Sequence, residues 1–157
     1  MLLLTAVVHW LHVVAGAVWF GGYLFVMTAL WPALLGRPAA ETRATVQALG
    51  ASAPRIMGPA TLVVIVLGIV RGTVLGPIRS WDALTGTGYG RAFLLSLVVT
   101  LWLMVHGGRA RGRLATRVWS GAGYAAGARA HLRRSGAVTL AGFAVVLACM
   151  VAMRFGI

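Results

Sequence analysis

Two pairs of residues, one near each end of the chain, have side chains that could bind a metal ion. His9 and His12 are three residues apart, which puts both imidazoles on one face of a helix. Imidazole suits copper, zinc and haem iron, and the sulfur atoms of Cys149 and Met153 suit Cu(I). Counted along their helices, all four residues fall in the outer leaflet, so the sequence predicts a copper site of His9, His12, Cys149 and Met153. In the structural alternative, His12 hydrogen-bonds a neighbouring helix and the two sulfur side chains fill apolar space.

A second group of residues suits a b-type haem. His12 and His106 could each provide an axial imidazole, and Arg91 could bind an anion such as a haem propionate. At ~1.5 Å per helical residue, His106 lies about 25 Å below His12, so the two cannot ligate one iron. A ligand role for His106 therefore requires a second, inner site. The structural alternatives are an interfacial hydrogen bond for His106, headgroup contact for Arg91 and a solvated His131.

These residues lie in or beside four long apolar runs. Hydrophobic residues make up 60% of the 157 and charged residues only 10%, against about 25% in soluble domains. The runs predict helices over about 2–34, 56–75, 91–108 and 136–155, each near the roughly 20 residues that cross a bilayer. The predicted fold class is all-α, an integral membrane four-helix bundle that forms a single domain over 1–157.

The charged residues predict how the bundle is oriented. All 14 basic residues are arginines, only two residues are acidic, and the net charge is +12. Because the arginines lie between apolar runs, they suit lipid headgroups, and we expect a lipid bilayer and no nucleic acid as partner. They concentrate in 36–55 and 109–134, which the positive-inside rule places in the cytoplasm. We therefore expect a multi-pass protein of the inner (plasma) membrane, N-out/C-out, with a short amphipathic helix over 121–130.

Three of the runs carry small and polar residues at alternating spacings of three and four, the period of helix packing. We expect these stripes to face the bundle interior, because a polar side chain gains nothing from contact with lipid. They comprise His9, His12, Gly16, Trp19 and Tyr23; Gly58, Thr61, Ile65, Gly68 and Gly72; and Ser135, Thr139, Gly142, Val146, Cys149 and Met153. The glycine-rich faces would also permit a homodimer.

Four segments resemble the copper-resistance protein D (CopD-like) membrane family. Residues 12–22 (HVVAGAVWFGG) resemble that family's helix in which His precedes Trp-x-Gly-Gly, and 55–68 resemble its next helix. Residues 87–95 (TGYGRAFLL) are similar to its Tyr-Gly-Arg-x-Leu-Leu signature, and 132–138 to the start of its last helix. The resemblance covers nearly the whole chain, as one four-helix half of a longer protein, and implies copper handling. Ser96 stands where the family usually has Lys, and the last helix lacks the family's acidic residue.

A more distant resemblance is to the HemJ-type four-helix protoporphyrinogen oxidases. Those proteins are similar in length, with a first-helix His followed by Trp and a His late in the third helix, as are His12, Trp19 and His106 here. The resemblance implies haem b. Arg91 falls near the place of a family Lys.

Three functions remain open at this point. The first is a copper-handling membrane protein, for metal binding, transport or resistance; the second is a b-type haem protein, either a cytochrome b or a HemJ-like oxidase. The third is a non-catalytic membrane assembly subunit. A nucleophile–base pair, a phosphate loop and paired carboxylates are all missing from the sequence, which favours a protein that is not an enzyme; an enzyme here would be a haem-dependent membrane oxidoreductase. A copper or haem site on the outer side would take a copper-chaperone or redox partner there.

Overall fold

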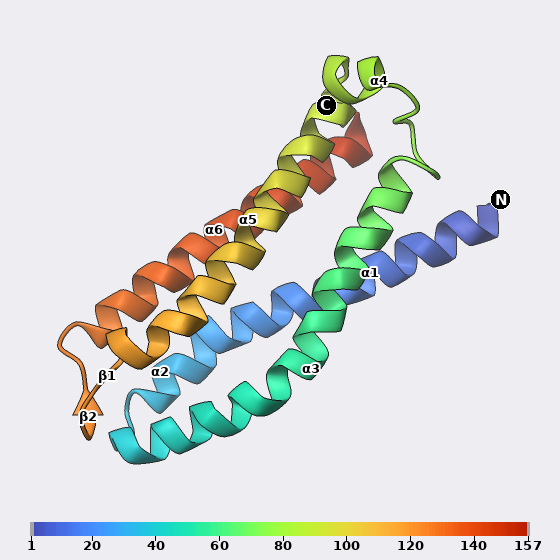
Figure 1. Cartoon of the computed structure of the whole chain (residues 1–157). Coiled ribbons are helices and arrows are strands. Elements are labelled where there is room, and N and C mark those ends of the chain that lie inside the picture. Colours follow the sequence, from blue (N-terminus) through green and yellow to red (C-terminus); the bar gives the residue numbers. More distant parts are fainter. Residues whose placement is uncertain (1, 157) are drawn as a thin grey trace.

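Long apolar helices dominate the computed structural model, which describes residues 2–156 (Figure 1). In chain order the elements are α1 (Leu2–Phe25), the π-helical segment η1 (Val26–Leu30), α2 (Trp31–Leu34), α3 (Ala39–Gly72), α4 (Trp81–Gly86), α5 (Gly88–Arg117), β1 (Trp119–Ser120), β2 (Gly123–Tyr124) and α6 (Ala128–Phe155). Four stretches are long and apolar enough to cross a membrane: Leu2–Leu34, Ala39–Gly72, Gly88–Leu114 and Ala128–Phe155. The all-α class and the number of spans are therefore as predicted.

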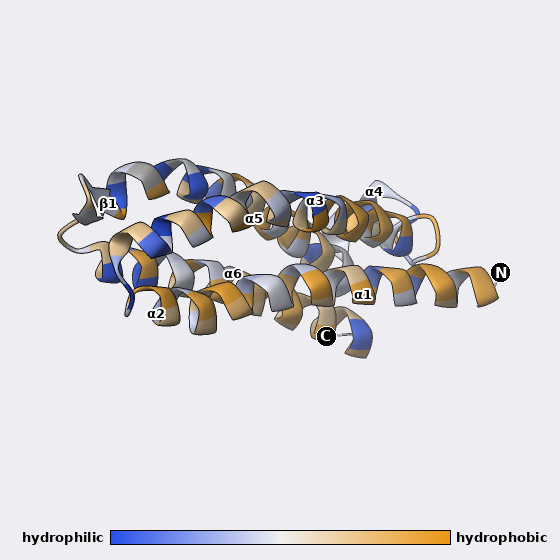
Figure 2. Ribbon diagram, turned by 90° about the horizontal axis from the view of Figure 1, so that it is seen from below, coloured by the Kyte–Doolittle hydropathy of each residue, from blue (hydrophilic) through white to orange (hydrophobic). Residues whose placement is uncertain are grey.

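The two ends of the bundle differ in polarity. We call the end that carries α2, β1, β2 and the starts of α3 and α6 the basic end, and the opposite end the α4 end. Figure 2 shows many of the hydrophilic residues gathered near β1, with hydrophobic residues along the helices. Both chain ends lie toward the α4 end (Figure 1), so the four spans alternate in direction.

The helix α3 begins at residue 39, whereas the sequence predicted a helix only from residue 56. Pro38, with φ −54° and ψ 140°, precedes the first helical turn, and the alanine-rich segment that follows is made of good helix formers. Hydropathy marks the part of a helix that lies in lipid, so a helix that continues into a polar layer is underestimated. Pro54 and Pro59 lie inside α3, where each removes a backbone hydrogen bond, and the helix is bent (Figure 1).

The connection between α5 and α6 is a short hairpin, so the prediction of an amphipathic helix over 121–130 is wrong. Trp119 pairs with Tyr124, and Ser120 pairs with Gly123. Gly121 at the turn has φ +55°, and Gly127 before α6 has φ +81°. Only glycine adopts such angles at little cost, so Gly121 permits the hairpin turn and Gly127 permits the turn that leads into α6.

The first span changes its helical pitch near the basic end. Pro32 lacks an N–H, and its ring displaces the carbonyl one turn earlier. The chain accommodates it in the five residues of η1, where the backbone N–H of Trp31 donates to Val26, and the Thr28 hydroxyl donates to the Leu24 carbonyl over 2.7 Å. The wider π-helical turn keeps the first span continuous up to Leu34.

Small residues bring the helices close together, as the stripes predicted. A side chain at Gly16 would meet Val64, and one at Gly142 would meet Leu103 at 2.8 Å, so α1 packs on α3 and α5 packs on α6. Trp19, Val64, Leu103 and Phe143 form the buried centre of the bundle. Two stripe residues depart from the prediction: His9 is exposed, and Gly58 has no neighbouring atom within 4 Å of a built Cβ. Gly58 lies on another face of α3 than its neighbour Met57, which contacts Gly22 of α1.

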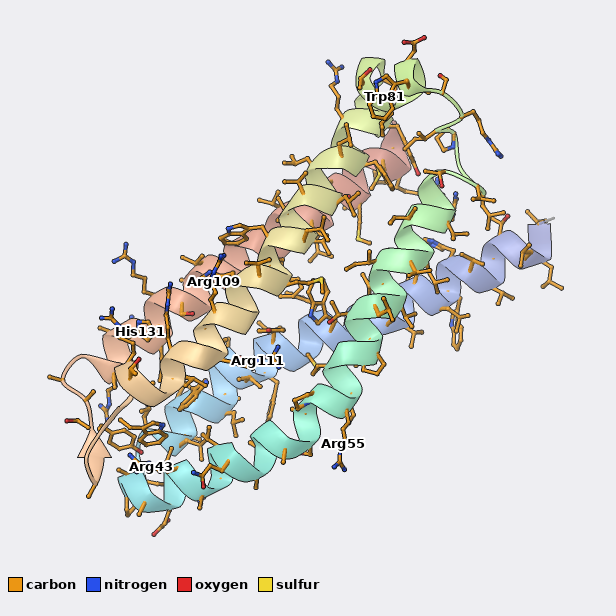
Figure 3. The ribbon with its side chains drawn as sticks, viewed as in Figure 1. Arg43, Arg55, Trp81, Arg109, Arg111 and His131 are labelled. Atoms are coloured by element: carbon orange, nitrogen blue, oxygen red, sulfur yellow. The ribbon has the colours of Figure 1, made fainter. Side chains whose placement is uncertain are left out.

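Side-chain hydrogen bonds tie the basic end together. The Tyr124 hydroxyl lies 2.8 Å from Thr42 Oγ1 and 3.0–3.1 Å from the carbonyls of Arg37 and Leu34. The Thr42 hydroxyl, which is fully buried, donates to the same Leu34 carbonyl over 2.7 Å. Arg43 donates to the Gly121 carbonyl over 2.9 Å and covers the Trp119 ring (Figure 3). These contacts hold the hairpin against the α2–α3 connection.

Candidate functional site

His12 is buried at the contact between α1 and α3, with 8% of its surface exposed. Its ring lies on the backbone of Gly68, where a built Cβ would be 3.0 Å from the imidazole Cε1. The absence of a side chain at position 68 therefore makes the space that the ring fills. Both residues belong to the predicted stripes, and the structure brings them together.

One nitrogen of the His12 ring has no partner. Its Nδ1 is buried and has no hydrogen-bond partner within the described part of the chain. An unsatisfied buried polar atom costs about 1–3 kcal/mol, so such atoms are uncommon and indicate function when they occur. His9 lies one turn away on the same helix, and its side chain is exposed. The pair presents one buried and one accessible imidazole.

Cys149 is a free, buried thiol on α6, and Met153 is half-buried one turn further on. Gly142 of α6 packs against Leu103 of α5, and the two helices run antiparallel. Cys149 lies seven residues after Gly142, and Ser96 lies seven residues before Leu103. Because the helices are antiparallel, Cys149 and Ser96 are at the same level of the bundle. The two sulfur side chains therefore belong to the α5–α6 half of the bundle.

Cys149 and His12 lie at a similar depth but on different helix pairs. Gly72 of α3 packs against Phe93 of α5, and one turn toward the basic end lies Gly68, with His12 against it. Gly68 and His12 therefore lie at the level of Cys149, to within about one helical turn. Laterally His12 and Cys149 are separated, because the first half of α1 diverges from α6 toward α3 (Figure 1). Within residues 2–156, His9, His12 and Cys149 do not form a metal-binding group, and neither does any other set of three His, Cys, Asp or Glu side chains.

His106 on α5 is the second imidazole with a partnerless nitrogen. Its ring stacks on Trp102, with the ring centres 5.0 Å apart and the planes at 21°, and its Nε2 is buried without a partner in the described structure. The Tyr23 side chain lies against Gly107, the residue after His106. Tyr23 is eleven residues from His12 on the first span, which corresponds to roughly 16 Å. His12 and His106 therefore belong to two separate sites.

A cavity of about 300 Å³ lies beside His106 between α5 and α6. Its lining is basic, with two histidines and three arginines, and is completed by small or apolar side chains: His106, Ala110, Arg113, Arg117, His131, Arg134, Ser135 and Val138. His131 is half-buried in the first turns of α6 and lines this cavity, so the prediction that it lies in a loop is wrong. We call this cavity the basic pocket.

The residues that line the basic pocket follow a helical spacing in the sequence, but hydropathy does not reveal it. On α5, positions 106, 110, 113 and 117 repeat at helical spacing, and on α6 so do 131, 134, 135 and 138. Each set forms a single stripe. That the two stripes face each other depends on the rotation of α5 against α6, which a single sequence does not specify.

Arg91 and Arg71 are among the arginines near the α4 end. Arg91, a predicted anion ligand, is exposed in the first turn of α5, after Thr87, whose side chain accepts a hydrogen bond from the Gly90 N–H. Arg71 donates to the Leu75 carbonyl over 3.3 Å, while its Nε is buried without a partner in the described structure. The structure brings neither arginine into the basic pocket.

No family model, no curated protein and no solved structure matches this chain.

Proposed function

We propose that this chain is a copper-handling membrane protein that holds Cu(I) at His12. The observation that carries the proposal is the buried Nδ1 of His12, which has no hydrogen-bond partner in residues 2–156. A neutral imidazole nitrogen with a free lone pair is a ligand for copper. Packing against the Gly68 backbone restricts the orientation of the ring, and a functional side chain needs such support from its neighbours.

The remaining ligands have to come from accessible or neighbouring groups. His9, one turn away on α1, is accessible and supplies a second imidazole. Cys149 and Met153 lie at the same depth on α6 and would join the site through a movement of α1 toward α6. A soft, singly charged ion suits this arrangement, because the sulfur side chains and the imidazoles are neutral or soft donors. The resemblance to the CopD-like family supports the same function.

Copper content of the purified protein tests the proposal. Wild-type protein in detergent is loaded with Cu(I) under reducing conditions and titrated with a chromophoric Cu(I) chelator. The His12→Gln variant should lose copper at a chelator concentration at least about ten-fold lower than wild type does. His131→Gln, which changes a histidine outside this site, is the matched control and should behave as wild type. Copper retention unaffected by His12→Gln would overturn the proposal.

A b-type haem protein is the second candidate, and the free Nε2 of His106 is the observation that favours it. An axial haem ligand needs such a nitrogen, and the arginines of the basic pocket would suit the propionates. The test is an absorption spectrum of protein expressed with ample haem. A Soret band that His106→Ala abolishes supports the haem function, and a colourless protein rules it out.

A further inference from the structure

The arginines of the basic pocket make no side-chain hydrogen bonds within the described residues, unlike other arginines at the basic end. Arg43 and Arg129 donate hydrogen bonds to the backbone carbonyls of Gly121 and Leu35, and so hold the connections at the basic end. Arg113, Arg117 and Arg134 donate none to the described residues, although all three line one cavity. Three guanidinium groups that converge without an anion repel one another, so the pocket is set up to receive negative charge.

No acidic side chain of this chain neutralises the pocket. The two acidic residues are Glu41 in the first turn of α3 and Asp82 in the first turn of α4, and neither lines it. The buried Nε2 of His106 adds one more unsatisfied polar atom beside the pocket, and stacking on Trp102 holds that ring in place. The neutralising group therefore has to come from outside the chain.

The basic pocket opens on the side of α5 and α6 that faces away from α1. On α6, Gly136 packs against Met27 of η1. At about 100° per residue, the α6 pocket positions 131, 134, 135 and 138 are turned by roughly 100–160° away from that contact. The pocket is therefore a groove on the outer surface of the bundle, where lipid would lie. Figure 3 shows His131 at the basic end of α6.

An apolar strip leads from the groove toward the α4 end. Leu95 and Trp102 on α5 and Val138 and Val145 on α6 follow the same faces of their helices, and 37–50% of the surface of each is exposed. A positively charged cavity at one end of a strip of exposed apolar side chains matches an amphiphile with an anionic head. A soluble peptide or a nucleic acid would gain nothing from the strip.

We propose that the basic pocket binds the phosphate headgroup of an anionic phospholipid, whose acyl chains lie along the strip between α5 and α6. Arg113, Arg117 and Arg134 donate charge-assisted hydrogen bonds to the phosphate oxygens. His106 and Ser135 supply further donors in the same cavity. This site is independent of copper at His12.

Native mass spectrometry of the full-length protein with added phosphatidylglycerol tests the proposal. The triple variant Arg113→Gln/Arg117→Gln/Arg134→Gln is compared with the matched control Arg109→Gln/Arg111→Gln/Arg133→Gln. The control removes the same charge from the same two helices at exposed positions outside the pocket. The pocket variant should bind phosphatidylglycerol at least about ten-fold more weakly than wild type, because three charge-assisted hydrogen bonds are lost. The control should change affinity by less than about two-fold.

Two further arms, and one outcome of the comparison between the triple variants, separate the alternatives. Phosphatidylcholine, whose headgroup has no net charge, should bind no better to wild type than to the pocket variant. Inorganic phosphate should displace phosphatidylglycerol only weakly, because it cannot use the apolar strip; displacement at equal concentration would overturn the lipid assignment in favour of free phosphate. Equal loss in both triple variants would overturn the site and leave only general surface attraction.

Folding and copper binding serve as controls on the variants. The pocket variant should keep the wild-type elution volume and the wild-type Cu(I) retention, because His12 is remote from the pocket. A Soret band that disappears in the pocket variant would assign the groove to haem and overturn the lipid proposal.

Discussion

His12 and His106 each present a ring nitrogen without a partner among residues 2–156, but in opposite electrostatic surroundings. His12 lies among the apolar residues of α1 and α3, and its polar neighbours are the Val64 backbone and His9. His106 lines a pocket that three arginines share. A cation is repelled by the second environment but not by the first, whereas an anion is attracted only by the second. The same side chain therefore serves two kinds of ligand, and the neighbouring charges decide which.

The largest effect is expected from a leucine at Gly68. Even a Cβ at this position would lie 3.0 Å from His12 Cε1, so Gly68→Leu should displace the ring. Overpacking of this kind should cost about 1–3 kcal/mol of stability, and Cu(I) retention should be lost. Thermal unfolding and chelator titration measure the two. Gly58→Leu, on the same helix in open space, is the control, and equal effects of both changes would disconnect Gly68 from the site.

Salt should separate the two sites almost as strongly. Between about 0.1 and 1 M salt, the Debye length falls from about 10 to 3 Å, which screens the exposed arginines of the basic pocket. Phosphatidylglycerol affinity should fall about ten-fold, while Cu(I) affinity at the buried His12 should change by less than about two-fold. Parallel titrations at the two salt concentrations test this, and copper that is as sensitive to salt as the lipid would contradict the comparison.

Replacing His12 with leucine should stabilise the copper-free protein by about 1 kcal/mol, because an unsatisfied buried nitrogen is removed. The copper-loaded wild type should in turn be more stable than the copper-free one. Denaturation in detergent with and without Cu(I) measures both. A copper-free His12→Leu protein less stable than wild type would mean that His12 has a structural hydrogen-bond partner.

The smallest effect is expected at the stacking partner of His106. Trp102→Leu removes an aromatic contact worth about 0.5–1.5 kcal/mol, so the ring of His106 gains freedom. Phosphatidylglycerol affinity should fall a few-fold, and copper retention should stay as in wild type. Trp10→Leu, at an exposed position on α1, is the control for loss of a surface tryptophan. A copper effect of Trp102→Leu would mean that the two sites are coupled.

The sequence predicted the spans and most of their inner faces. Lipid requires a certain number of apolar residues, and backbone approach requires small ones, so Gly16, Gly68 and Gly142 follow from local patterns. Helix ends were less predictable, because the residues of α3 before Pro54 are helical but polar. Hydropathy identifies only the part of a helix that lies in lipid.

The candidate sites were only partly predictable for a geometric reason. Counting residues along helices gives depth, and depth placed Cys149 level with His12, as the register of the helices also does. It gives no lateral position, and the crossing of α1 over α3 leaves the two on different helix pairs (Figure 1). The basic pocket likewise depends on how α5 is rotated against α6, which no local pattern contains.

The Tyr124 hydroxyl also bears on the order of assembly. Its three oxygen partners, on Leu34, Arg37 and Thr42, lie in or directly beside the connection between the first two spans. That connection is synthesised about 80 residues before the tyrosine. The first helical hairpin thus presents its acceptors before the tyrosine is made, and the tyrosine can reach them only after the third span, Gly88–Leu114, has been synthesised.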